Sequence, residues 1–132
     1  MYEAGGHDSL EIDRHVNRVF CVKCLPEDGN VFFSGGWDST VQVWDLRVGT
    51  GSVRQIHGPA ITSDSLDYKK GTLLVGNYSN NDTAQLYSFG EGKLISTIDL
   101  GLPPNSTSYC FSAAFAHRSE YDLLGVALSG SN

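Results

Sequence analysis

Residues 31–47, VFFSGGWDSTVQVWDLR, decide the fold of this chain. The segment opens with three apolar residues, and residues 40–45 (TVQVWD) then alternate valines with polar or aromatic side chains. Alternation with a period of two residues is typical of a strand, because successive side chains of a strand point to opposite faces. Gly35 and Gly36 stand between the two runs, where the backbone must reverse. The segment therefore predicts two strands joined by a tight turn, with Trp44 buried against the sheet.

Similar runs, separated by turns rich in glycine, asparagine and aspartate, recur along the chain and predict an all-β fold. We expect strands at residues 18–24, 31–35, 40–45, 53–57, 60–68, 72–76, 83–89, 93–100, 109–116 and 123–128. Residues 9–12 are interpreted as the last strand of a preceding unit, and residues 129–132 as the start of a turn.

The order of these strands, the two-glycine turn before Asp38, and the closing pair Trp44-Asp45 resemble a WD40 repeat, the four-stranded blade of a β-propeller. The resemblance implies about three blades: one at about 16–57, a second at about 58–100 and a truncated third at about 105–132. Because propellers typically close with 4–8 blades, 132 residues predict an incomplete propeller. The function implied is a non-catalytic scaffold for protein–protein interactions.

The WD40 family places a buried polar network in many blades, and the matching positions here are His15, Ser34, Asp38 and Trp44. The resemblance implies that Asp38 accepts a hydrogen bond from the His15 ring, whose other nitrogen meets the Ser34 hydroxyl. The same hydroxyl would accept a bond from the Trp44 indole N–H. A serine, a histidine and an aspartate also suggest a hydrolase triad, but their place in a repeated element favours the structural role.

The second unit, at about residues 58–100, matches the same pattern less closely. It keeps His57, and Ser79 stands near the position of Ser34, but Asn80 or Asn81 replaces the aspartate. We therefore expect its polar network to be weaker or absent.

In a propeller, the loops before the first strands and between the second and third strands share one rim. Trp37 is the strongest candidate for binding a protein there, because it directly precedes the turn aspartate and a large exposed aromatic suits a hot spot. The alternative is that Trp37 lies flat on the neighbouring blade. The residues expected on this rim are Asn17, Arg18, Trp37, Tyr78, Asn80 and Tyr109.

The sequence Trp44-Asp45-Leu46-Arg47 also resembles the box found in substrate receptors of cullin-RING ubiquitin ligases. In those receptors the counterpart of Arg47 contacts the ligase adaptor, which makes such an adaptor an alternative partner. Most positions of the box are requirements of the fold, so a solvated Arg47 without that role is the other interpretation.

Residues 34–40, SGGWDST, match the phosphate-binding loop of the ATP pyrophosphatase family. In that family a helix follows the loop and its N-terminus helps to bind phosphate. Residues 40–45 alternate like a strand and soon reach Gly49, which makes a poor helix. Nucleotide binding is therefore a remote alternative.

Composition narrows the choice of partners and compartment. The net charge is −6, and nine scattered Lys and Arg residues disfavour nucleic acid as a partner. Cys21, Cys24 and Cys110 resemble neither a disulfide framework nor a metal site, and no apolar run approaches the ~18 residues of a membrane span. We expect a cytoplasmic or nuclear protein with no cofactor and no enzymatic activity, able to self-associate through open blade edges.

Overall fold

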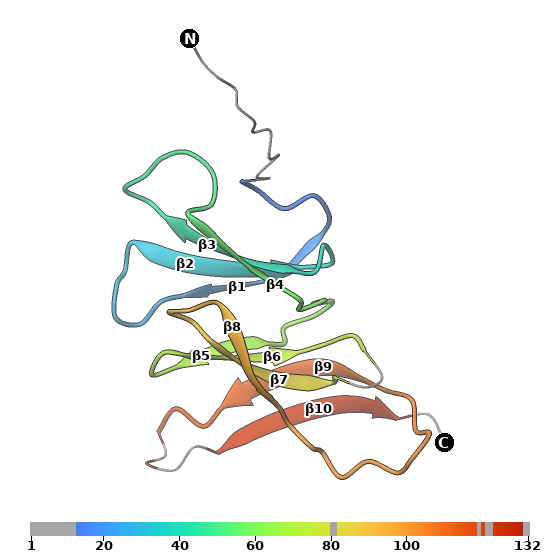
Figure 1. The fold of residues 1–132 in the computed structure, drawn as a ribbon. Coiled ribbons are helices and arrows are strands. Elements are labelled where there is room, and N and C mark those ends of the chain that lie inside the picture. Colours follow the sequence, from blue (N-terminus) through green and yellow to red (C-terminus); the bar gives the residue numbers. More distant parts are fainter. Residues whose placement is uncertain (1–12, 80–81, 119, 121–122, 131–132) are drawn as a thin grey trace.

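Three antiparallel sheets lie stacked one on another in the computed structural model, which describes residues 13–79, 82–118, 120 and 123–130 (Figure 1). The first sheet has the order β1-β2-β3-β4, the second β5-β6-β7-β8, and the third is the hairpin β9-β10. The described residues contain no helix, so the fold is all-β, and the sheets do not close into a ring. The strands are β1 (Val19–Cys24), β2 (Val31–Gly36), β3 (Thr40–Asp45), β4 (Arg54–His57), β5 (Leu66–Lys69), β6 (Thr72–Gly76), β7 (Ala84–Ser88), β8 (Lys93–Thr97), β9 (Ser108–Phe115) and β10 (Leu124–Gly130).

The β2–β3 turn is held by its aspartate. Asp38 Oδ1 accepts hydrogen bonds from the Thr40 hydroxyl (2.9 Å) and the Thr40 N–H (3.3 Å). This local pairing lets Ser39 adopt a φ of 59°, in the left-handed region that most residues avoid. The chain then enters β3 in register, with Val43 opposite Phe33 and Val41 opposite Gly35.

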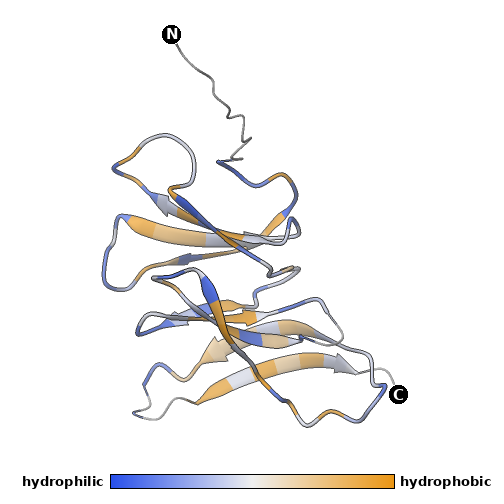
Figure 2. Ribbon diagram, in the orientation of Figure 1, coloured by the Kyte–Doolittle hydropathy of each residue, from blue (hydrophilic) through white to orange (hydrophobic). Residues whose placement is uncertain are grey.

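Alternation along the strands sends one set of side chains into the space between the first and second sheets. The rings of Phe33, Tyr68 and Phe89 contact one another there, with pairwise centroid distances of 5.4–6.0 Å. The Arg54 guanidinium lies 4.8 Å from the centroid of Phe89. A second apolar cluster lies between the second sheet and the β9–β10 hairpin, around Leu74. Much of β2 and β10 is orange in Figure 2, whereas the turn between β1 and β2 is mostly hydrophilic.

The structure differs from several of the expected strand limits; β8, for example, ends at Thr97 rather than at residue 100. β5 begins at Leu66 rather than at residue 60, because the preceding segment crosses between the first two sheets: the Ile61 N–H donates to the Gly36 carbonyl (3.0 Å). β10 continues through Gly130, because Ser129 and Gly130 still pair with β9 instead of turning. The strand expected at residues 9–12 lies outside the described residues.

Trp44 is half-buried rather than buried. Its ring stacks on Phe32, with centroids 5.9 Å apart and planes 8° from parallel, on the face of the first sheet that points away from the second. Nothing described covers this outer face as completely as the second sheet covers the other one, so the indole keeps some contact with solvent.

Candidate functional site

Four side chains form a polar network at the end of the first sheet. His15 Nδ1 lies 2.8 Å from Asp38 Oδ2, and His15 Nε2 lies 2.8 Å from Ser34 Oγ. The Trp44 indole N–H donates to the same Ser34 oxygen, also at 2.8 Å. A neutral imidazole with its proton on Nδ1 satisfies every contact: it donates to Asp38 and accepts from Ser34, which in turn accepts from Trp44. The network joins the segment before β1 to β2, the β2–β3 turn and β3.

Asp38 is the centre of this polar network. The side chains of His15 and Asp38 are almost fully buried, and Asp38 also accepts the Val16 N–H at 3.0 Å. Burial alone would raise the pKa of Asp38, but hydrogen bonds from Thr40, His15 and Val16 outweigh it and hold that pKa below its usual value. The Ser34 hydroxyl is buried and shared by two partners, so the arrangement fixes a turn rather than presenting a nucleophile.

Trp37 projects from the turn that this network holds. Trp37 is 48% exposed, and its ring meets that of Phe20 edge-on, with centroids 6.4 Å apart. The Trp37 backbone N–H donates to the Arg18 carbonyl at 2.9 Å. Arg18 is exposed, and its own N–H donates to the Asn17 side chain at 2.8 Å. The structure therefore brings three of the residues expected on the rim together.

Tyr78 occupies the corresponding turn of the second sheet. It is 42% exposed and stacks on Tyr109, with ring centroids 4.2 Å apart and planes at 15°. The crossing segment joins the two turns, because the Tyr78 N–H donates to the Ala60 carbonyl (2.9 Å) and the next residue, Ile61, bonds to Gly36. Asn80, also expected on this rim, lies outside the described residues.

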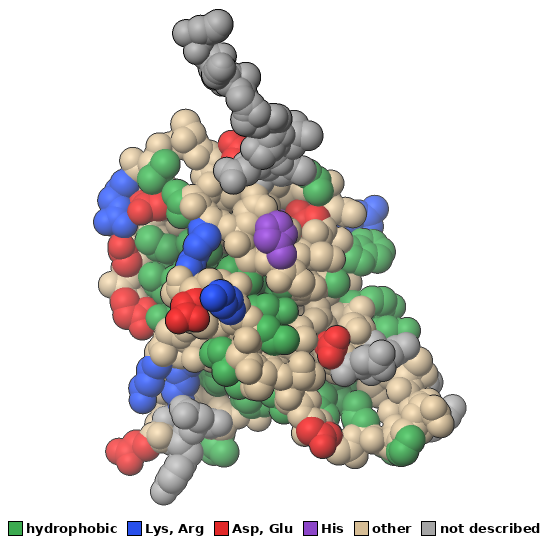
Figure 3. Space-filling view, viewed as in Figure 1, with side chains coloured by type: hydrophobic (Ala, Val, Ile, Leu, Met, Phe, Trp, Pro, Cys, Tyr) green, Lys and Arg blue, Asp and Glu red, His purple; other side chains and the backbone are tan. Residues whose placement is uncertain are grey.

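We call the surface formed by Phe20, Trp37, Tyr78 and Tyr109 the aromatic rim. Figure 3 shows hydrophobic side chains grouped along the edge of the molecule where the β2–β3 and β6–β7 turns lie. Charged side chains gather at the opposite edge. The aromatic rim is thus an apolar strip, supported by the ends of two sheets.

The second sheet has a polar network that the sequence analysis missed. The Asn77 amide donates to Gln85 Oε1 (2.7 Å), which also accepts the Tyr87 hydroxyl (3.1 Å), and Asn77 Oδ1 accepts the Ala60 N–H (2.6 Å). The expected residues do not make it, since His57 is exposed on β4. A signal was available: Gln42 precedes Trp44 by two residues, just as Gln85 precedes Tyr87.

Arg47 is neither free nor simply solvated. Its guanidinium makes two hydrogen bonds of 2.8 Å to the Asp45 carboxylate and one of 2.9 Å to Asp28. These bonds to Arg47 hold the pKa of Asp45 at about 2. The arginine of the WDLR sequence therefore ties the β3–β4 loop to the β1–β2 turn.

The cysteines and the phosphate-loop motif offer no chemistry of the kinds considered above. Cys21 points into the core, where its thiol donates to Asp64 (3.1 Å), whereas Cys24 is exposed on the other face of β1. No group of metal-ligating side chains occurs among the described residues. Thr40–Asp45, where nucleotide binding would need a helix, is strand β3.

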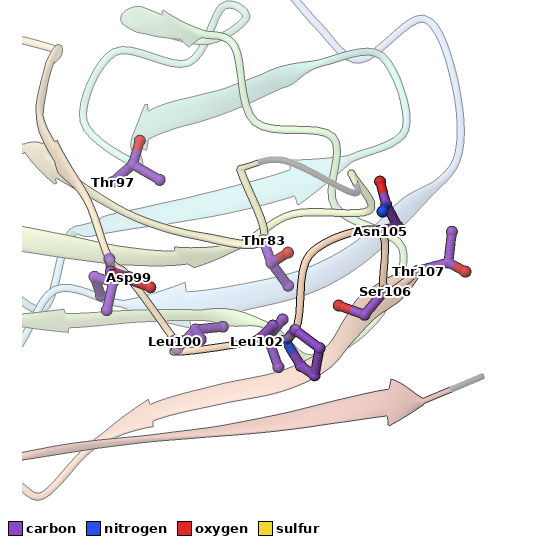
Figure 4. A pocket seen from close by; sticks show the side chains of 10 residues that line it. Thr83, Thr97, Asp99, Leu100, Leu102, Asn105, Ser106 and Thr107 are labelled. Carbon is purple, nitrogen blue, oxygen red and sulfur yellow. The ribbon is translucent and has the colours of Figure 1, made fainter. Parts of the chain in front are cut away.

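A groove of about 650 Å³ lies beside the loop between β8 and β9 (Figure 4). Its walls carry mainly hydroxyl, amide and apolar side chains, and Asp99 is the one acidic or basic residue among the ten that line it. It therefore lacks a pair of titratable side chains for acid–base chemistry. Among residues 13–79, 82–118, 120 and 123–130 there is no helix long and apolar enough to cross a membrane.

Comparison with known proteins gives consistent matches. Residues 6–45 match the WD40 family model, described as WD domain, G-beta repeat. The chain is 28% identical over 78 residues to the guanine nucleotide-binding protein subunit beta of Oryza sativa subsp. japonica, covering 59% of this chain and 20% of the relative. It is 31% identical over 70 residues to the mitotic checkpoint protein bub-3 of Caenorhabditis elegans, covering 52% of this chain and 20% of the relative.

Among solved structures, the β-propeller domain of Cps50 (Swd1) from Myceliophteria thermophila is similar in fold. The TM-score is 0.65 at 21% sequence identity, over 87% of this chain and 32% of that one. The chain spans about a fifth of the length of the curated relatives that it matches.

Proposed function

Because this chain is a WD40-repeat protein built of β-propeller blades, we propose that it is a non-catalytic scaffold that binds another protein through the aromatic rim. The observation that carries the proposal is the exposure of Trp37 and Tyr78 on neighbouring turns of two blades. Large aromatic side chains supply most of the energy at many protein interfaces.

The support beneath the aromatic rim favours binding. The buried carboxylate of Asp38 and the Arg18 carbonyl both hold the turn that carries Trp37. A stacked partner, Tyr109, holds Tyr78 in place. Side chains that are already ordered lose less conformational entropy when a partner arrives. Rigid blades with specific loops are a common arrangement for recognition.

Site-specific photo-crosslinking tests this proposal. A photoreactive amino acid is placed at position 37 or 78, and in the control at Ile95 on β8, which is exposed to a similar degree (56%). In extracts, positions 37 and 78 should capture the same protein, and position 95 should not. Capture of the same protein at equal yield from all three positions, or from position 95 alone, would refute binding through the aromatic rim.

The ubiquitin-ligase alternative gains no specific support, because the guanidinium of Arg47 is already engaged by Asp45 and Asp28. The nucleotide-binding alternative lacks its helix. The cysteines of this chain are free, which fits the reducing environment of the cytoplasm or nucleus that we infer for the scaffold.

A further inference from the structure

The second sheet shows that the aromatic rim stays open where a sheet has neighbours on both sides. Tyr78 lies in the β6–β7 turn of this sheet, which packs against the first sheet on one face and against the β9–β10 hairpin on the other. Tyr78 is nevertheless 42% exposed. Trp37, in the corresponding turn of the first sheet, is exposed to a similar degree, 48%. The exposure of these turns therefore reflects their place at the ends of strands and does not depend on an uncovered sheet face.

A single peptide group sets the distance between the two turns. Its carbonyl, that of Ala60, accepts the Tyr78 N–H at 2.9 Å, and its N–H, that of Ile61, donates to the Gly36 carbonyl at 3.0 Å. The peptide group thus lies between the two turns as a central strand lies between two neighbours, which places their backbones about 10 Å apart. A polyproline II helix has three residues per turn and advances about 9 Å in each turn. Residues three positions apart in such a helix are therefore spaced to reach the two turns in succession.

The side chains of the aromatic rim also carry unused hydrogen-bond donors. The Trp37 indole N–H and the hydroxyl groups of Tyr78 and Tyr109 donate to no other residue in the described part of the chain. The backbone of both turns is already in use, because the N–H groups of Trp37 and Tyr78 donate to the carbonyls of Arg18 and Ala60. A partner therefore meets aromatic faces and side-chain donors here, and no free strand edge.

We propose that the aromatic rim binds a proline-rich segment in the polyproline II conformation, an inference that rests on the proposed function of the rim as a protein-binding surface. The carbonyls of such a segment make no internal hydrogen bonds, so they can accept from the indole of Trp37 and the hydroxyl of Tyr78. An α-helix has already used its carbonyls internally, and an added strand needs free backbone groups that these turns do not offer. Proline rings pack on aromatic faces, and their fixed φ lowers the entropy lost on binding.

Nuclear magnetic resonance titration of the ¹⁵N-labelled whole chain with a decaproline peptide tests this proposal. The indole N–H signal of Trp37, identified by its absence in Trp37→Phe, should shift saturably. A glycine–serine peptide and an alanine-rich helical peptide of the same length should not shift it. Trp37→Phe and Tyr78→Phe each keep an aromatic ring but lose one donor, so backbone amide signals should report binding about 5-fold weaker than in the wild type. Ile95→Ala, on exposed β8, should bind like the wild type.

Absence of a saturable shift would overturn the proposal, as would an equal shift with either control peptide or unchanged affinity in both phenylalanine variants. If the amide spectrum shows that Tyr78→Phe is unfolded, Tyr109→Phe removes the other hydroxyl of the same stacked pair and should weaken binding instead. The crosslinking experiment separates this inference from the function on which it rests. If positions 37 and 78 capture a protein that decaproline does not displace, the proposed function stands and the proline-rich ligand is refuted.

Discussion

Replacing Ser34 by alanine is the sharpest test of the network that holds the Trp37 turn. One oxygen atom, Ser34 Oγ, contacts both His15 Nε2 and the Trp44 indole N–H at 2.8 Å. The substitution removes both contacts without changing the turn sequence. It leaves a buried ring nitrogen and a half-buried indole N–H without their partner.

The expected cost follows from these contacts. Each neutral hydrogen bond contributes about 1 kcal/mol net, and a buried polar group left unpaired costs about 1–3 kcal/mol. Water can reach the indole in part, because Trp44 is half-buried, so the lower part of this range applies to it. We therefore expect Ser34→Ala to lower the free energy of unfolding by about 2–3 kcal/mol.

Urea unfolding followed by circular dichroism, at one fixed protein concentration, measures this change. In a Trp44→Phe background the indole N–H is already gone, so Ser34→Ala should cost about 1 kcal/mol less there. Ser96→Ala on exposed β8 is the matched control, with an expected effect within about 0.5 kcal/mol. An equal cost of Ser34→Ala in both backgrounds would refute the shared-oxygen account.

Three further predictions follow from the same region. The pKa of Asp38 is lowered in the folded state, so its stabilising effect is present above its unfolded pKa of about 3.9 and is lost as the pH falls through the lower folded value. In urea titrations between about pH 5 and pH 2, stability should therefore fall more steeply in the wild type than in Asp38→Asn. Gly36→Ala should cost about 1–3 kcal/mol in thermal unfolding, because the added Cβ would meet the Arg18 carbonyl; an unchanged midpoint would contradict this packing. Burial and the neighbouring Asp64 carboxylate raise the pKa of Cys21 to about 12, so iodoacetamide at neutral pH should modify Cys24 in the native protein and Cys21 only in urea, as peptide mapping would reveal.

The limits of a strand were predictable where the local sequence pattern and the tertiary contacts favour the same structure. Residues 40–45 and 72–76 were predicted with the observed limits, because alternation and flanking turn residues mark both ends. The prediction of a strand at residues 60–65 was wrong, because hydrogen bonds to neighbouring turns hold this segment out of the sheet. No local sequence pattern encodes these hydrogen bonds. Ser129 and Gly130 look like turn residues but are held in β10 by pairing with β9.

The polar contacts likewise include some that the sequence predicts and some that it does not. The contacts of His15 with Asp38 and Ser34 follow from the resemblance, since the family pattern fixes their spacing. Asn77 and Gln85 build the second network from amides, and a search for histidine and aspartate overlooks them. The pairing of Arg47 with Asp28 joins residues 19 positions apart, through a loop geometry that the sequence does not specify.

Affinity for the partner captured at the aromatic rim tests the proposed function most directly. Isothermal titration of that partner should show Trp37→Ala binding about 30-fold more weakly than the wild type, the loss expected when an interface aromatic worth about 2 kcal/mol is removed. The Ile95→Ala control should bind like the wild type. Equal affinity of Trp37→Ala and the wild type would contradict recognition through the aromatic rim.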